Sequence, residues 1–178
     1  MFDKLKKISA STHLKNPEKV VEWITGKINK RLDNPGYIEQ LNEAIKMIDK
    51  KLDVIFEEGG DIIDLNNRTA YQIKAIHASR RDMESFKNNL KSAANQFITE
   101  STPNGYRKFI KIKFVNPESQ LYYKNLREFR NELQKYYNAV KNNDVVGSNL
   151  LAVDEIQIEN KIGKFRYEIK DDVVFILN

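Results

Sequence analysis

The stretch DIIDLNNRTAYQIKAI, residues 61–76, decides which fold this sequence predicts. Apolar residues dominate positions 61–65 and 69–76, and the polar residues 66–68 between them are typical of a tight connection. Residues 52–56, which precede a Glu-Glu-Gly-Gly turn, have the same strand character. We therefore expect three successive short strands that form a meander.

Helical periodicity surrounds this meander on both sides. Asn16 and Pro17 are typical of the first residues of a helix, and apolar residues then recur at helical spacing to about Leu32. The same spacing predicts further helices over residues 37–51 and 81–98, and a long one from about residue 117 to 140.

Further strands are predicted in the second half of the chain. Residues 109–115 alternate between apolar and polar side chains, which predicts a strand. A loop is expected at residues 142–148. Three short β segments then close the chain, over residues 153–158, 165–169 and 173–177. This order of elements predicts an α/β (α+β) fold in which helices flank a mixed central β-sheet. The 178 residues fit one domain, 1–178, with residues 1–15 expected to be a flexible lead-in.

Composition limits the classes of protein and of metal site. The chain has no cysteine, which excludes disulfides and thiolate metal sites, and it has no apolar run long enough to predict a membrane span. The net charge is +5, and residues 77–150 carry 13 Lys and Arg against 7 Asp and Glu. A basic middle behind a carboxylate-bearing segment suits an enzyme that binds a polyanion and cleaves it with a metal ion.

Gln72 and Lys74 are the two long polar side chains of an otherwise apolar strand. Side chains two residues apart share one face of a strand, so both are expected to point the same way. Metal-dependent phosphodiester cleavage needs carboxylate and amide oxygens to hold Mg²⁺ or Mn²⁺, and a cation to stabilise charge on the phosphate. An exposed edge strand, where lysine discourages aggregation, is the competing interpretation.

The segment resembles the PD-(D/E)XK, or restriction-endonuclease-like, nuclease superfamily. The pattern of that superfamily is a helix glutamate, a hydrophobic strand, an aspartate, and then acidic-x-lysine on the next strand. Here Gln72 replaces the acid before Lys74. Residues 37–98 also resemble toxin domains of contact-dependent growth inhibition and related polymorphic toxins, on Gln72-Ile-Lys74-Ala-Ile and a following helix that carries Phe86, Asn89, Leu90, Ala93, Ala94 and Gln96.

The resemblance implies catalytic roles for Lys74, Gln72, an aspartate and a helix glutamate. Asp64 and Asp61 are both candidates for the aspartate, and we prefer Asp64; hairpin register decides which one shares the Gln72 and Lys74 face. Asp53 is a third candidate. For the helix glutamate we choose Glu43 over Glu39, although both lie almost opposite the apolar stripe of their helix, as a solvated face would.

The predicted metal ligands are therefore Asp64, Asp61 and Glu43. Lys87 and Lys91, one helical turn apart beside the predicted site, are expected to contact phosphates. Lys111 and Lys113, on one face of their strand, can be read in the same way or as a solvated face.

The function predicted from the sequence is that of a metal-dependent nuclease toxin domain in interbacterial competition, with tRNA favoured over DNA. The resemblance implies a cognate immunity protein as partner, secretion within a larger exoprotein, and delivery to the cytoplasm of a target cell. The alternatives are a restriction or repair DNA endonuclease in the cytoplasm of its own cell, and a basic nucleic-acid-binding module without activity.

Overall fold

The computed structural model describes residues 2–28, 35–57, 62–78, 80–99 and 102–178. A seven-stranded sheet with strand order β1-β2-β3-β4-β5-β6-β7 forms its centre. β1 to β3 pair antiparallel, β4 and β5 continue parallel to β3, and β6 and β7 are antiparallel again. The strands are β1 (Val54–Phe56), β2 (Ile62–Asp64), β3 (Thr69–Ile76), β4 (Arg107–Phe114), β5 (Glu155–Glu159), β6 (Lys164–Lys170) and β7 (Val173–Leu177). Both the predicted meander and the predicted mixed sheet are confirmed.

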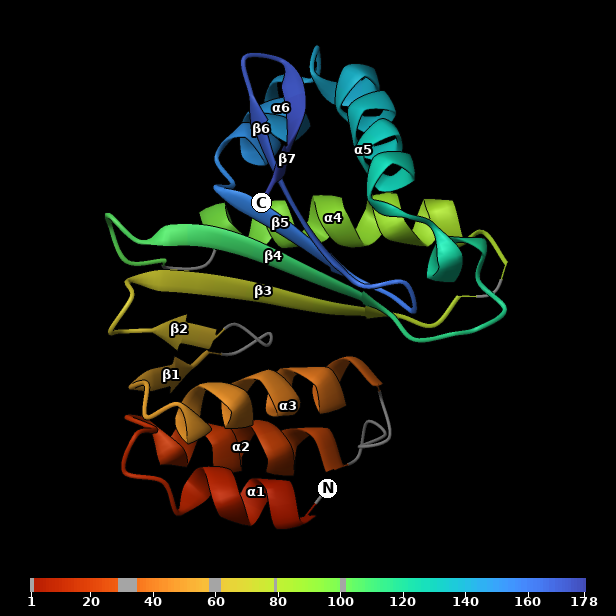
Figure 1. Ribbon diagram of the computed structural model, residues 1–178. Helices are drawn as coiled ribbons and strands as arrows, with labels where there is room; N and C mark the ends of the chain where they lie inside the picture. The colour runs from red at the N-terminus through yellow and green to blue at the C-terminus, as the bar shows by residue number, and fades with distance from the viewer. Residues whose placement is uncertain (1, 29–34, 58–61, 79, 100–101) are drawn as a thin grey trace.

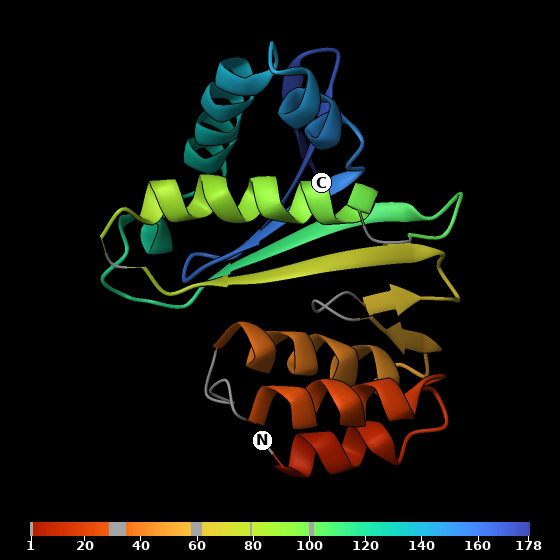
Figure 2. The ribbon, with the colours of Figure 1, turned by 180° about the vertical axis from the view of Figure 1, so that it is seen from behind.

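Helices cover the sheet on two sides (Figures 1 and 2). One layer contains α1 (Phe2–Ser9), α2 (Pro17–Ile28) and α3 (Pro35–Asp49), of which α3 packs directly on β3. The other layer contains α4 (Asp82–Thr99), α5 (Leu126–Val140) and α6 (Asp144–Leu151), of which α4 packs on β3 and β4. The sheet therefore has an α3 face and an α4 face.

The two faces have separate hydrophobic cores because the side chains of β3 alternate between them. Ala70 and Ile76 belong to the core under α4, together with Phe86 and Leu90 of that helix. Ile73 belongs to the smaller core under α3. Any residue of β3 can thus be assigned to a face by whether its number is odd or even.

Three local predictions differ from the structure. The expected flexible lead-in contains α1, and Ile8 and Leu14 from this region are buried in the core under α3. The expected loop at 142–148 contains most of α6, which begins after Asn143, whose side chain accepts a hydrogen bond from the backbone N–H of Val146. The long helix expected from residue 117 is divided into a 3₁₀ turn at Gln120–Tyr123 and α5, which begins with a capping box between Asn125 and Glu128.

Within the described ranges, none of the helices combines the length and the apolar character that crossing a membrane requires.

Candidate functional site

Gln72 and Lys74 lie on the α4 face of β3, as their shared parity with Ala70 and Ile76 requires. The ammonium group of Lys74 donates a hydrogen bond to the Oε1 atom of Gln96, which lies near the end of α4. The prediction that the two polar side chains share one strand face is therefore confirmed. The edge-strand interpretation is wrong, because β3 is paired on both sides, with β2 and with β4.

The side chain of Gln72 is fully buried in this face. Its neighbour across the parallel pairing with β4 is Ile110, which is also fully buried and belongs to the hydrophobic core. An amide in such surroundings has to make its hydrogen bonds within the protein, a requirement that an apolar side chain does not have. Packing alone would favour an apolar residue here, so the glutamine indicates a role other than filling space.

Asp64 lies on the other face of the sheet. It pairs with Thr69 across the hairpin, and Ile62, two residues earlier, pairs with Tyr71 and belongs to the core under α3. The carboxylate of Asp64 accepts hydrogen bonds from the backbone N–H of Asn67, at 3.0 Å, and from its Nδ2, at 2.7 Å. The prediction that Asp64 shares the face of Gln72 and Lys74 is wrong. Its side chain instead holds the turn between β2 and β3.

Glu43 and Glu39 also lie on the α3 face, because they project from α3 toward β4. Glu43 pairs with Lys111 at 2.9 Å and Glu39 pairs with Lys113 at 2.9 Å, and the side chains of the two glutamates are only 15% and 13% exposed. The expectation of a fully solvated glutamate face is wrong, because the polar edge of α3 packs against the lysine side chains of β4.

The ion pairs of Glu43 set its protonation state. Burial works to raise its pKa, but Lys111 and Lys46 outweigh that effect and lower the pKa from 4.5 to about 2. Glu43 is therefore ionised at neutral pH and bound to two ammonium groups. These contacts give it a structural role in joining α3 to β4.

The structure thus separates the described metal-ligand candidates from the strand pair Gln72 and Lys74. Asp64 and Glu43 lie on the α3 face, whereas Gln72 and Lys74 lie on the α4 face. Asp61 falls outside the described residues. Asp53 lies beside the N-terminal segment, where it contacts His13 at 2.9 Å and Lys15 at 3.1 Å. Over the ranges that the structure covers, no three acidic or histidine side chains are grouped as a metal site would require.

Lys87 and Lys91 lie on α4, and the buried stripe of this helix does not include them. Lys91 is exposed and Lys87 is partly exposed. A polyanion bound to the outer side of α4 would be able to contact both lysines. Their contact with phosphate stays a prediction.

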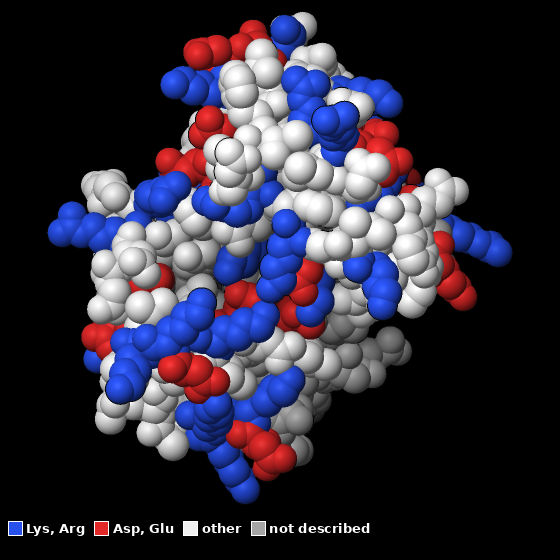
Figure 3. Space-filling model, viewed as in Figure 1, with Lys and Arg blue, Asp and Glu red and all other residues white. Residues whose placement is uncertain are grey.

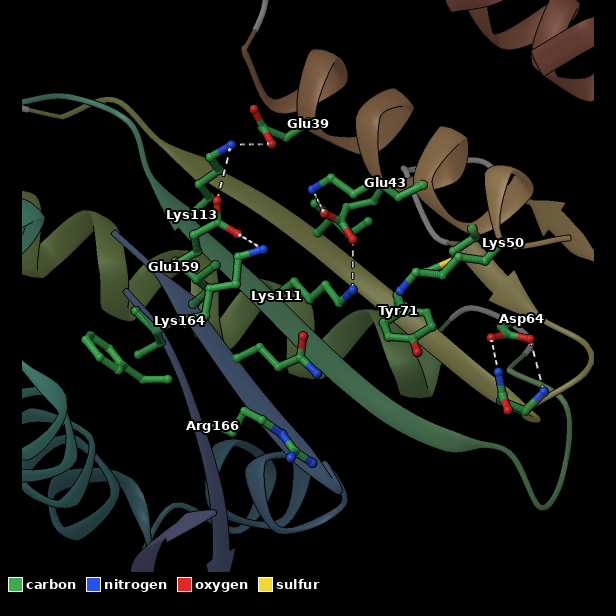
Figure 4. Close-up of a pocket in the computed structure, with 18 of the residues that line it drawn as sticks. Glu39, Glu43, Lys50, Asp64, Tyr71, Lys111, Lys113, Glu159, Lys164 and Arg166 are labelled. Atoms are coloured by element: carbon green, nitrogen blue, oxygen red, sulfur yellow. Dashed lines mark hydrogen bonds and ion pairs between the residues drawn. The ribbon is translucent and has the colours of Figure 1, made fainter. Parts of the chain in front are cut away.

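The α3 face contains a cleft that the sequence did not predict (Figure 4). Its volume is about 430 Å³ and it lies between α3 and the strands β3 to β6. Ten of its lining residues are charged: Glu39, Glu43, Lys46, Lys50, Asp64, Lys111, Lys113, Glu159, Lys164 and Arg166. The alternation of residues 109–115 placed Lys111 and Lys113 together, but only the pairing of β4, β5 and β6 brings Glu159, Lys164 and Arg166 beside them.

The chain matches no protein-family model, no curated protein and no solved structure. The assignment of a function therefore depends on the residues described above and on the resemblance that the sequence carries.

Proposed function

We propose that this protein is a metal-dependent nuclease whose active centre includes Lys74 and Gln72 on the α4 face of the sheet. The observation that carries the proposal is a buried glutamine and a lysine, two residues apart on one face of a central strand whose remaining side chains on that face are apolar. Packing of the core by itself would favour apolar side chains at both positions. Metal-dependent phosphodiester cleavage uses groups of these two kinds, an oxygen ligand for the metal and a cation for the phosphate.

Gln96 supports the proposal by fixing the lysine. Its side-chain oxygen accepts a hydrogen bond from the ammonium group of Lys74, and it projects from α4, which packs against β3. A lysine held between a strand and a helix keeps its ammonium group in one place. That placement lets the charge stabilise a phosphate in the transition state without first losing side-chain freedom.

A divalent metal, Mg²⁺ or Mn²⁺, fits this face only in part. The amide oxygen of Gln72 is a suitable ligand, but the described carboxylates Asp64 and Glu43 belong to the other face. Asp61, which lies outside the described residues, remains the aspartate predicted from the sequence. When bound, the metal would polarise the phosphate and lower the pKa of a water molecule.

The biological role that we propose is that of a toxin domain in interbacterial competition, delivered to the cytoplasm of a target cell as part of a larger exoprotein. The sequence resemblance supports this role, favours tRNA over DNA as substrate, and implies a cognate immunity protein. The surplus of basic residues in positions 77–150 supports a polyanionic substrate.

The test of this proposal is incubation of the purified protein with total RNA and with plasmid DNA, in Mg²⁺ and in EDTA. We expect Mg²⁺-dependent cleavage of the RNA, with discrete tRNA fragments on a denaturing gel. Cleavage of plasmid DNA alone would make the restriction or repair alternative correct. Cleavage that EDTA leaves unchanged would contradict the metal mechanism.

Asp64, in β2, and Asp61, three residues earlier in the sequence, provide a matched pair of variants. We expect Asp61→Asn to lose most of the cleavage activity while keeping the thermal stability of the parent. Asp64→Asn should keep activity and lose about 1–2 kcal/mol of unfolding free energy, because an amide replaces one of the two acceptor oxygens that Asn67 contacts. Circular dichroism melts and cleavage rates, measured on both variants, separate the two roles. The reverse pattern would return the ligand role to Asp64.

The two lysines of α4 provide a separate prediction about substrate binding. The double variant Lys87→Ala, Lys91→Ala should bind a tRNA more weakly, and the slope of log affinity against log salt should fall by about 2, since each phosphate contact contributes roughly one counterion. Filter binding in EDTA at several salt concentrations measures the slope. An unchanged slope would show that the polyanion does not lie along α4.

A further inference from the structure

The cleft on the α3 face has the size and the charge of a site for a small anion-bearing molecule. Its volume of about 430 Å³ falls in the range of small-molecule sites, roughly 300–1,000 Å³. Its lining has six basic side chains against four acidic ones. Figure 3 shows the same pattern on the surface, where lysine and arginine side chains surround a small acidic group in the middle of this face.

The positive surplus is concentrated on one side of the cleft. Arg166 is neutralised by the fully buried Glu155. The carboxylate of Glu155 accepts hydrogen bonds from Nε of Arg166, at 2.7 Å, and from Nη2 of Arg166, at 2.9 Å. Lys113 and Lys164 are balanced by their ion pairs with Glu159 and, for Lys113, with Glu39. These groups therefore leave little free charge at that side.

The other side of the cleft holds three ammonium groups for two carboxylates, Glu43 and Asp64. Lys46 and Lys111 share Glu43, at 2.5 Å and 2.9 Å. Lys50, which directly follows the last residue of α3, also lines the cleft. Within the described part of the chain, Lys50 takes part in no ion pair.

Tyr71 adds a neutral hydrogen-bond donor and an aromatic ring to the same side (Figure 4). Lys111 lies over one face of its ring, with 4.5 Å from Nζ to the ring centroid, and Phe109 packs edge-on at 5.4 Å. Burial, together with the nearby carboxylate of Asp64, raises the pKa of the Tyr71 hydroxyl to about 12. The hydroxyl is therefore protonated at neutral pH and can donate a hydrogen bond to an anion.

We propose that this cleft binds a small phosphate monoester, with its phosphate group held by Lys46, Lys50, Lys111 and the hydroxyl of Tyr71. The three lysines of this side, set against Glu43 and Asp64, leave a surplus of one positive charge, so an anion is favoured here. The oxygens of a phosphate group can each accept from one of the ammonium groups or from the Tyr71 hydroxyl. The volume of the cleft leaves room for a sugar or a nucleoside on the phosphate. The site lies on the face opposite Lys74, so the proposal does not depend on the proposed nuclease activity.

The test is isothermal titration calorimetry of the whole chain at low salt, with adenosine 5′-monophosphate, ribose 5-phosphate, inorganic phosphate and adenosine as probes. We expect the two monoesters to bind more tightly than inorganic phosphate and adenosine not to bind. Affinity should fall as NaCl is raised, because the contacts are ionic. Binding of adenosine 5′-monophosphate alone would identify a nucleotide site, and equal binding of ribose 5-phosphate would identify a site for the phosphate and sugar only.

Two variants and one control link binding to the cleft. Lys50→Ala should weaken binding about tenfold, because one charge-assisted hydrogen bond is lost, and Tyr71→Phe should weaken it about threefold while keeping the ring. Lys135→Ala, which removes an exposed lysine of α5, should leave the affinity unchanged. Absence of binding by both monoesters, or equal binding by the Lys50→Ala and parent proteins, would overturn the proposal.

Discussion

Lys74→Ala is expected to lower the rate of nucleic-acid cleavage by about 10²–10³-fold, the loss that follows removal of one preorganised group that stabilises transition-state charge. The affinity for nucleic acid, measured in EDTA, should change by no more than a few-fold, since a single contact among many is removed. Single-turnover cleavage assays and filter binding on the same preparation measure the two quantities. The difference between the two effects is what identifies an enzyme rather than a binding module.

A matched control for this variant is Lys113→Ala. Lys113 is also a partly exposed lysine of a central strand, but it lies on the α3 face and pairs with Glu39. The control removes the same charge from the protein and should keep the cleavage rate of the parent. Equal losses in both variants would indicate a general electrostatic effect, and an unchanged rate in Lys74→Ala would place the active centre elsewhere.

Glu43→Gln is expected to reduce the free energy of unfolding at pH 7 by about 3 kcal/mol at most. The pKa of Glu43 is lowered from 4.5 to about 2 in the folded protein, mainly by Lys111 and Lys46 acting against burial. A depressed carboxyl pKa stabilises the fold above the unfolded-state pKa, and the stabilisation disappears as the pH falls through the folded-state pKa. The difference between parent and variant should therefore be full above about pH 4.5 and vanish toward pH 2.

Urea unfolding of both proteins at several pH values between 7 and 2.5 measures this dependence. Glu118→Gln serves as the control, because Glu118 is exposed and its replacement should leave stability within about 0.5 kcal/mol. If Glu43→Gln kept the stability of the parent at every pH and lost cleavage, the catalytic role first predicted for Glu43 would be correct.

Local sequence patterns were sufficient to predict most helices and strands, and to predict which polar residues share one face of a strand. The apolar character of residues 69–76, bounded by a polar turn, predicted β3 with its observed bounds, and the two-residue period of a strand placed Gln72 and Lys74 on one face. Alternation likewise separated Lys111 and Lys113 from Ile110 and Ile112. These features follow from the geometry of a strand and from the local contrast of apolar and polar residues, so they need no knowledge of distant contacts.

Helix and loop boundaries were predicted less well where tertiary contacts determine them. Residues 1–15 carry many lysines and look like a lead-in, yet Leu14 forms a bridge with Val54, and the side chain of Asn16 bonds the backbone of Phe56 in both directions. Those contacts form only because β1, which contains Val54 and Phe56, lies beside this segment in the folded protein. A segment that contributes only a few apolar residues shows no clear periodicity of its own.

The sequence by itself determined the meander and the shared face of Gln72 and Lys74, because each depends on residues that are close together in the chain. The order of helices and strands along the chain was enough to predict a mixed sheet. Only the tertiary structure decided which face each remaining residue occupies. Asp64 pairs with Thr69, and this register turns its carboxylate away from Gln72; a shift of one residue would reverse it. The position of α3 over β4 likewise joins Glu43 to Lys111, 68 residues away, and forms the cleft. Register and helix packing depend on the energy of the whole core, which no short segment contains.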